Sequence, residues 1–256
     1  MTEHARIELE PPTAALKRGD KGPKVRQVQE WLCLHDFHTA VDGDFGPATE
    51  AALKDFQRDM DTLWEEPRTA YDELGTVGPA TWRVLTEPLR NVVQWARQPS
   101  LADASAIVDC AMAHLIANPR EAGRPNGGSW VRLYCRGQEV PWCAGFATTV
   151  LGQALGHDKW HTLSCDELAH KAQARDLWVP STAKEQRYLL KPGCLFVVRA
   201  SEYDWVHTGI VTAVGDGYFE TIEGNTNTTG AREGTAVHAR TRAFGPHIDF
   251  VLMGER

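Results

Sequence analysis

The sequence predicts an α+β protein in which a small helical bundle precedes a larger domain of helices packed on an antiparallel sheet. Three observations favour this class. Apolar residues recur at helical spacing up to Leu177, strand patterns dominate from Leu195 onward, and the turn Gly215–Gly217 joins two of the strands. Helices first and strands afterwards is an α+β order, unlike the alternation of strand and helix that builds parallel sheets.

The helical N-terminal region contains an internal repeat. The pentapeptide Phe45–Thr49 recurs as Val77–Thr81, and each copy runs into further apolar residues. In each copy the glycine can cap a helix, and the proline suits the first helical position. Such self-similarity predicts two equivalent helical units within a domain over residues 12–87. The stretch between them, Asp61–Leu74, is long and charged, which predicts an altered surface there.

A connector over residues 88–100 is expected to follow this bundle. Pro88 interrupts the helical pattern, and Trp95 suggests that the connector packs against a domain. Pro99-Ser100 resembles a break and an N-cap before the next helix. We therefore expect a second domain over residues 101–256.

The second domain is predicted to begin with helices and to end with strands. Apolar residues at helical spacing indicate helices over residues 101–117, from Cys143 onward and over residues 166–177, with a loop at residues 123–128. The expected strands are Leu195–Arg199, His207–Val214, Tyr218–Glu223, Thr235–Arg240 and Ile248–Met253.

Composition is typical of a globular protein and excludes several partners. The chain has 256 residues, more than the roughly 100–200 of one domain. No stretch approaches the ~18 apolar residues that span a bilayer, so no membrane insertion is expected. A net charge of −7 argues against nucleic acid as a partner. Residues 1–12 are polar without an apolar signal region, which predicts synthesis in the cytoplasm without Sec export.

Cys143 and His207 have the residue types of a cysteine nucleophile and its base. Pro141 suits a first helical turn, so Cys143 would open a buried helix, where the helix dipole favours the thiolate. His207 begins an apolar strand that would hold its imidazole rigidly. Glu223 and Asn225 lie two residues apart on the next strand, so both would project from one face toward His207. Glu223 is favoured as the direct partner because its carboxylate would stabilise the imidazolium.

The second domain resembles the CHAP family, the cysteine- and histidine-dependent amidohydrolases and peptidases that cut bacterial peptidoglycan. The resemblance rests on the Pro141–Ala147 cysteine motif, the His207 strand and the Glu223–Asn225 tripeptide. Gly193-Cys194 stands where the family usually has Gly-Asp. The resemblance implies a papain-like fold and amide cleavage through a thioester acyl-enzyme, without a cofactor. The enzyme would be an N-acetylmuramoyl-L-alanine amidase or an endopeptidase of the stem peptide or cross-bridge.

The N-terminal bundle resembles a peptidoglycan-binding domain of the small three-helix type. The matching stretches are Leu16–Asp20, Val25–Leu32 and Val41–Thr49. The resemblance implies bacterial peptidoglycan as the partner, with Asp44 and Phe45 as candidate contacts to it.

Aromatic residues beside the proposed nucleophile and base are further candidate substrate contacts. Trp142 precedes the cysteine, and Tyr203 and Trp205 precede the histidine. The last two are also compatible with an ordinary loop that contains a packed tryptophan.

The other cysteines and two histidines raise questions about disulfides and metals. Six cysteines occur without paired CxxC spacing, so most are expected to stay thiols. Cys135 and Cys165 flank the nucleophile and could pair in an oxidising periplasm. His157, His161 and Cys165 recur every four residues, which would suit zinc on a helix, but Gly156 and the polar run after it disfavour that helix. No metal site is therefore predicted.

The leading interpretation is a monomeric, bacteriolytic peptidoglycan hydrolase. A phage endolysin, released by a holin, is the expected setting, and a secreted antibacterial toxin of the same chemistry is the alternative. Two other classes remain open: a non-catalytic wall-binding protein and a cysteine acyltransferase. Release of dye from labelled wall would exclude the first, and mass analysis for a transferred acyl group would test the second.

Overall fold

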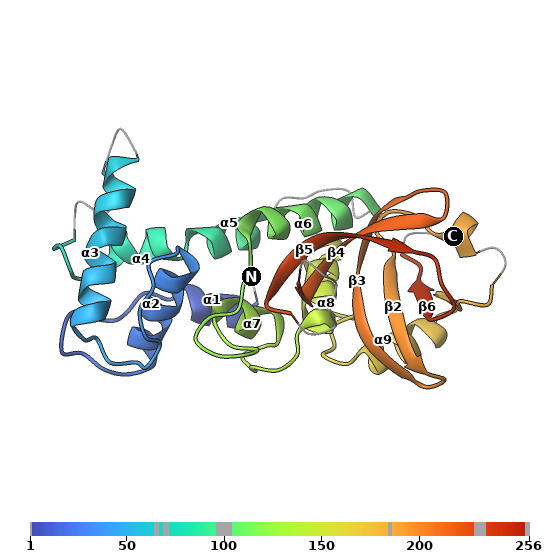
Figure 1. Cartoon of the computed structure of the whole chain (residues 1–256), viewed down its shortest axis with the longest axis horizontal. Coiled ribbons are helices and arrows are strands. Elements are labelled where there is room, and N and C mark those ends of the chain that lie inside the picture. The colour runs from blue at the N-terminus through green and yellow to red at the C-terminus, as the bar shows by residue number, and fades with distance from the viewer. Residues whose placement is uncertain are drawn as a thin grey trace. The chain divides into compact units, whose positions relative to one another are not determined.

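The computed structural model of the chain has an α+β fold (Figure 1). The residues it describes are 2–63, 67–68, 72–95, 104–183, 186–227 and 234–253. By its contacts the chain divides into two compact units. The N-terminal unit is Met1–Asn91 with Arg120–Glu139, and the C-terminal unit is Val92–Pro119 with Val140–Arg256. The segment Arg120–Glu139, which lies within the expected second domain, thus belongs to the first unit by its contacts.

Helices build the N-terminal unit. They are α1 (Glu3–Leu9), α2 (Pro23–Leu34), α3 (Pro47–Thr62), α4 (Pro79–Leu85) and α7 (Ser129–Tyr134). Thr2 caps α1 by accepting a hydrogen bond from the Ala5 N–H at 3.2 Å, so a segment that was expected only to be polar is helical.

Most of the expected connector is helical. α5 (Glu87–Trp95) begins one residue before Pro88, so the proline lies in the first turn, where its missing N–H costs no helical hydrogen bond. Pro88 therefore starts a helix rather than interrupting one. Residues 96–100 and the side chain of Trp95, and with them its predicted packing, lie outside the described residues.

The sequence repeat is also a repeat of hydrogen bonds. α3 and α4 both begin at the proline of the repeated pentapeptide. Buried Gln29 donates to Thr49 Oγ1 at 3.0 Å and accepts from the Gly43 N–H at 2.7 Å. Buried Gln57 likewise donates to Thr81 Oγ1 at 3.0 Å, and it accepts from the Gly75 N–H at 2.8 Å. Each glutamine therefore ties a loop glycine to the threonine of one repeat. The predicted altered surface over Asp61–Leu74 falls partly on residues 64–66 and 69–71, outside the described part.

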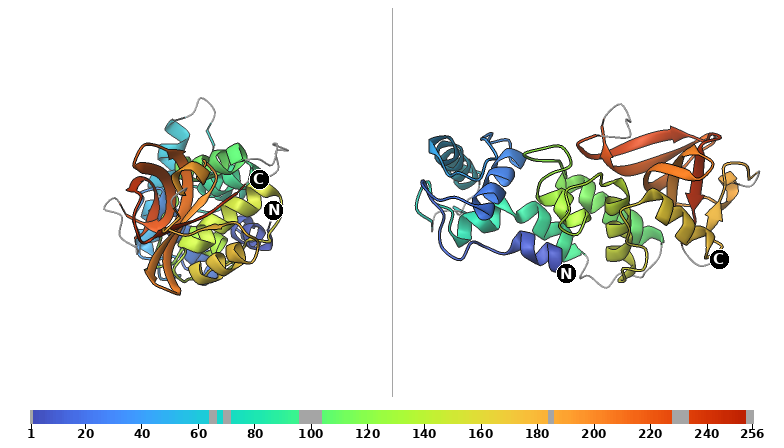
Figure 2. Two further views of the ribbon diagram at one scale, coloured as in Figure 1. Left: turned by 90° about the vertical axis from the view of Figure 1, so that its right-hand side faces the viewer. Right: turned by 90° about the horizontal axis from the view of Figure 1, so that it is seen from below.

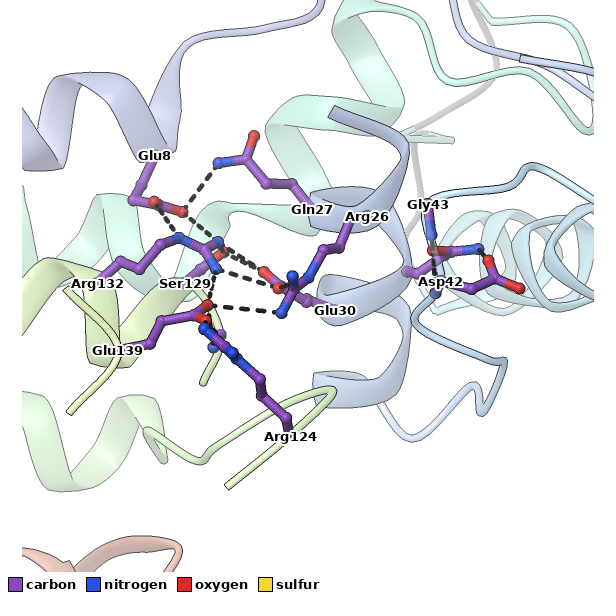
Figure 3. A network of polar contacts seen from close by, with 12 residues as sticks. Glu8, Arg26, Gln27, Glu30, Asp42, Gly43, Arg124, Ser129, Arg132 and Glu139 are labelled. Atoms are coloured by element: carbon purple, nitrogen blue, oxygen red, sulfur yellow. Dashed lines mark hydrogen bonds and ion pairs between the residues drawn. The ribbon is translucent and has the colours of Figure 1, made fainter. Parts of the chain in front are cut away.

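A charged network joins the Arg120–Glu139 segment to the rest of its unit (Figure 3). Arg132 donates to Glu8 of α1 at 2.7 Å, to Glu30 of α2 at 2.6 Å and to Glu139 at 2.9 Å. Trp130, next to it, packs edge-on against Trp31 of α2 with 6.0 Å between ring centroids. We call Arg132, Glu8, Glu30 and Glu139 the Arg132 network.

The C-terminal unit combines helices with one antiparallel sheet. Its helices are α6 (Ala104–Ala117), α8 (Cys143–Leu155), α9 (Cys165–Gln173) and α10 (Gln186–Leu189). Its strands are β1 (Trp178–Val179), β2 (Leu195–Ser201), β3 (Asp204–Val214), β4 (Tyr218–Thr226), β5 (Ala236–Ala243) and β6 (Ile248–Val251). Every strand expected from the sequence is present with small shifts at its ends, and the short β1 is an addition.

The sheet has the strand order β1-β6-β2-β3-β4-β5, and every neighbouring pair is antiparallel. α8 packs on β3 and β4, and α9 packs on β3, as the yellow-green and yellow helices below the orange and red strands show (Figure 2, right). Phe196, Phe219 and Phe250 form the centre of an apolar cluster within this unit. None of the helices in the described parts of the chain is long and apolar enough to cross a membrane.

Candidate active site

Cys143 is the first residue of α8, as the sequence predicts. No side chain caps this helix, so the N–H groups of its first turn remain available to other acceptors. The thiol is buried, with 7% of the residue exposed. A hydrogen bond with Cys165 lowers the pKa of Cys143 well below its ordinary value, and His207 and the Thr208 N–H lower it further, against the opposing effect of burial. The site therefore favours a thiolate.

His207 lies on β3 with only 2% of the residue exposed. Its Nε2 is 2.8 Å from Glu223 Oε2. Its buried Nδ1 makes no hydrogen bond with any atom of the described residues. Burial lowers the pKa of His207, but Cys143 and Glu223 outweigh this effect and raise it to about 9. At neutral pH the imidazole is therefore protonated beside the Cys143 thiolate.

Glu223, on β4, is the residue that contacts His207. Its carboxylate is fully buried and accepts hydrogen bonds from Thr221 Oγ1 at 2.6 Å and from two nitrogens of Arg242, each at 2.6 Å. Burial raises the pKa of Glu223, but Arg242 and His207 lower it more, to about 2. The carboxylate is therefore ionised throughout the ordinary pH range.

The strand is irregular at Asn225, so the regular alternation that would place Asn225 and Glu223 on one strand face does not hold there. The pairing of β4 with β5 shifts register between Glu223 and Thr226, and Asn225 adopts a φ of 55°. Alternation of side chains holds only for a regular strand, and this bulge breaks it. Asn225 is buried, and its carbonyl accepts from the Gly234 N–H at 3.1 Å.

Arg242, on β5, completes the charged part of the site and was not foreseen from the sequence. Its guanidinium binds both oxygens of Glu223 and lies 4.7 Å from the ring centroid of Phe196. Arg242 pairs across the strands with Phe219 and not with Glu223, so the contact depends on a long side chain that runs along the sheet. No local pattern marks such a contact, because it requires the register of β4 and β5.

Cys165 is the second unforeseen neighbour. It is the first residue of α9, and its Sγ lies 3.8 Å from Cys143 Sγ. Cys135, the disulfide partner proposed for it, is a buried cysteine of the N-terminal unit. His157 and His161 lie in the non-helical segment before α9, so the helical spacing required for the zinc alternative is missing. Among the described residues, no group of three or more His, Cys, Asp or Glu side chains could hold a metal ion.

The candidate substrate contacts of the C-terminal unit differ in exposure. Trp142 is fully buried, and Trp205 is 6% exposed. Trp205 Nε1 donates to Asp249 at 2.8 Å, and its ring packs edge-on against Trp178. Both tryptophans are therefore packing residues in this structure. Tyr203 is 72% exposed and is available to a ligand.

The two candidate wall contacts of the N-terminal unit differ in the same way. Phe45 is fully buried and belongs to the core. The Asp44 side chain is 47% exposed and pairs with Lys21 at 2.6 Å. Of these two neighbours, only Asp44 presents side-chain atoms to a partner.

Two family models match the chain. Residues 21–62 match the model described as a putative peptidoglycan binding domain, and this match contains α2 and α3. Residues 135–225 match the CHAP domain, and this match contains Cys143, His207 and Glu223. Neither the search of curated proteins nor the search of solved structures found a match.

The two matches agree with what each region shows. The first covers the helices that carry one copy of the hydrogen-bonded repeat, and the second covers the Cys143 helix together with β2, β3 and most of β4. A CHAP domain points to a peptidoglycan amidase or peptidase, and the other domain supports peptidoglycan as its partner. The chain is thus similar to a peptidoglycan-binding domain over residues 21–62 and to a CHAP domain over residues 135–225.

Proposed function

We propose that this protein hydrolyses an amide bond of bacterial peptidoglycan with Cys143 as the nucleophile. The bond would be the N-acetylmuramoyl-L-alanine amide or an amide of the stem peptide or cross-bridge. The observation that carries the proposal is a continuous series: Cys143 beside His207, His207 bonded to Glu223, and Glu223 bonded to Arg242. A cysteine, a base and a group that orients the base are the parts of nucleophilic amide hydrolysis.

The first half of the reaction forms a thioester. The Cys143 thiolate attacks the amide carbonyl carbon, and backbone N–H groups at the start of α8 stabilise the oxyanion. Collapse of the tetrahedral intermediate expels the amine, which takes the proton of His207. Because its pKa is raised, His207 carries this proton at neutral pH.

The second half releases the product. Neutral His207 accepts a proton from water as the water attacks the thioester carbonyl. The acid leaves, the thiolate returns and His207 is protonated again. Glu223 stays ionised through both steps and stabilises the imidazolium each time it forms. Arg242 holds that carboxylate in place with two parallel hydrogen bonds.

The N-terminal unit would hold the enzyme on the wall. Binding to the polymer raises the effective concentration of the active site near its bonds. The full-length Cys143→Ala variant should sediment with purified sacculi without dissolving them. If this variant stays in the supernatant, the binding role is wrong. Lysis by a phage endolysin or an antibacterial toxin is the biological role that such an enzyme would serve.

Mass spectrometry of digested sacculi tests the reaction directly. The wild-type protein should release fragments, and a new free N-terminal alanine would identify an amidase, whereas a new terminus within the stem or cross-bridge would identify an endopeptidase. Cys143→Ala should release none. Cys33→Ala is the matched control because Cys33 lies in α2 of the N-terminal unit and is not one of the proposed site residues. Intact sacculi after treatment with wild-type protein would overturn the proposal, and a transferred acyl group would indicate an acyltransferase.

A further inference from the structure

We propose that Cys143 and Cys165 form a reversible disulfide when the protein meets a hydroperoxide, and that this modification switches the nucleophile off. The loss of hydrolysis rests on the proposed function, whereas the disulfide itself does not. Two observations carry the proposal: the contact between the two sulfurs and the hydrogen bonds that hold their helices together.

The sulfurs are already in contact. Cys143 Sγ and Cys165 Sγ are 3.8 Å apart, and a disulfide requires about 2.05 Å. The two sulfurs therefore have to approach by about 1.8 Å before the bond can form. Both residues belong to the C-terminal unit, and each is the first residue of its helix.

Hydrogen bonds tie the segment that leads into α9 to helix α8. The hydroxyl of Thr148, on α8, donates to the Ala144 carbonyl at 2.7 Å and accepts from the Thr162 N–H at 3.3 Å, and it lies 3.1 Å from the Thr162 carbonyl. Ser164 then caps α9 by accepting from the Glu167 N–H at 3.2 Å. The segment that leads into Cys165 is thereby tied to the helix that begins with Cys143. These hydrogen bonds therefore hold the two sulfurs in contact.

The two thiols differ in a way that gives each a separate role. Cys143 is the thiolate of the pair. The pKa of Cys165 is raised by its hydrogen bond with Cys143, by burial and by the carboxylates of Asp166 and Asp204. Cys165 therefore stays a thiol. A thiolate reacts with peroxides, and a neighbouring thiol can then resolve the product.

The proposed chemistry balances in two steps. The Cys143 thiolate attacks one oxygen of the hydroperoxide ROOH, which breaks the O–O bond and leaves a sulfenic acid; the alkoxide takes a proton and departs as ROH. Cys165 then loses its proton and attacks the Cys143 sulfur, and the hydroxyl leaves as water. Two thiols and ROOH thus become a disulfide, ROH and water. A dithiol reductant restores both thiols and becomes oxidised itself.

Intact and peptide mass analysis of the full chain tests the disulfide. Reduced wild-type protein treated with hydrogen peroxide and then alkylated should contain a proteolytic peptide pair linked through Cys143 and Cys165. Cys33→Ala should give the same linked pair, and Cys165→Ala cannot. Absence of the linked pair from oxidised wild-type protein would overturn the proposal, whether or not the protein hydrolyses wall.

Recovery of activity tests the switch. Peroxide should lower wild-type hydrolysis of sacculi at least about tenfold, and dithiothreitol should restore it. In Cys165→Ala, excess peroxide should carry Cys143 to the sulfinic acid, so dithiothreitol should restore little. A purely structural role of Cys165 would change the starting activity but not this reversibility. Equal recovery of wild type and Cys165→Ala would overturn the reversible switch proposed for Cys143 and Cys165. Untreated wild-type protein without activity would instead refute the proposed function.

Discussion

Arg132 in the N-terminal unit and Arg242 in the C-terminal unit both bind fully or nearly fully buried glutamates. In the Arg132 network all three guanidinium nitrogens donate to carboxylates, and Glu8 and Glu30 are 3% and 0% exposed (Figure 3). Arg242 binds a single carboxylate, that of Glu223, and Glu223 shares its charge with His207.

The two clusters differ in whether their charged groups are all paired with one another. In the Arg132 network the positive charge is surrounded by acceptors from three parts of one unit, so it holds those parts together. In the second cluster the series continues from Arg242 through Glu223 to His207. The Nδ1 of His207 forms no hydrogen bond within the described residues, and His207 lies next to the Cys143 thiolate. One cluster is closed and structural, and the other ends in a group that can move a proton. Four predictions test this contrast.

The largest effect is expected at the open end of the second cluster. His207→Ala should lower the rate of sacculus hydrolysis by at least about 10⁴-fold, because Cys143 loses its proton donor and acceptor. The double variant with Cys143→Ala should be no worse, since the two residues act as a unit. The exposed His247 of the same unit provides the control, and His247→Ala should keep wild-type rates. Substantial activity in His207→Ala would remove this residue from the mechanism.

The next largest effect is expected on stability. Arg132→Met should lower the free energy of unfolding by about 3–5 kcal/mol, because Glu8 and Glu30 would remain buried without a compensating charge. Arg124→Ala is the control: its side chain is 57% exposed and pairs with Glu139 at the solvent-facing side, so a loss below about 1 kcal/mol is expected. Urea unfolding of both variants measures the difference, and equal losses would contradict a closed structural network. For the same reason, a fragment of residues 12–87 should be less stable than this unit in the full chain.

Glu223→Gln should act on rate and on its pH dependence together. We expect a loss of about 100-fold in kcat, because the amide cannot stabilise the imidazolium. Glu223 raises the pKa of His207, so its removal lowers that pKa and moves the alkaline limb of the pH–rate profile from about 9 to lower pH. Asn225→Ala should cost less and leave the limb in place. The reverse order of the two variants would give the orienting role to Asn225.

Arg242→Lys should have the smallest effect, about tenfold in kcat, because lysine keeps the charge but loses the two parallel hydrogen bonds. Arg242 lowers the pKa of Glu223, so weaker pairing raises that pKa and moves the acid limb of the profile to higher pH. Arg240→Lys, on the same strand, is the matched control because Arg240 donates to the Asn227 carbonyl and not to Glu223. An unchanged acid limb in Arg242→Lys would show that Arg242 only packs against Phe196.

Much of the architecture follows from local patterns. The glycine-proline pairs mark the starts of α3 and α4, and apolar alternation marks β2 to β6. The position of Cys143 at a helix start and of His207 on a strand also follows, because a proline and an apolar run are local signals. Local patterns failed at Pro88, where a proline that can start or end a helix was assigned the wrong role.

The fold class, the resemblance to two families and the choice of Cys143, His207 and Glu223 as candidates all follow from the sequence alone, because each depends on residues close together in the chain. The contacts of Glu223 with His207, of Arg242 with Glu223 and of Cys165 with Cys143 are seen only in the folded structure. These contacts depend on strand register, on a bulge at Asn225 and on how two helix starts are packed. Such features arise from contacts between residues far apart in the chain, and the energy of those contacts exists only once the chain has folded.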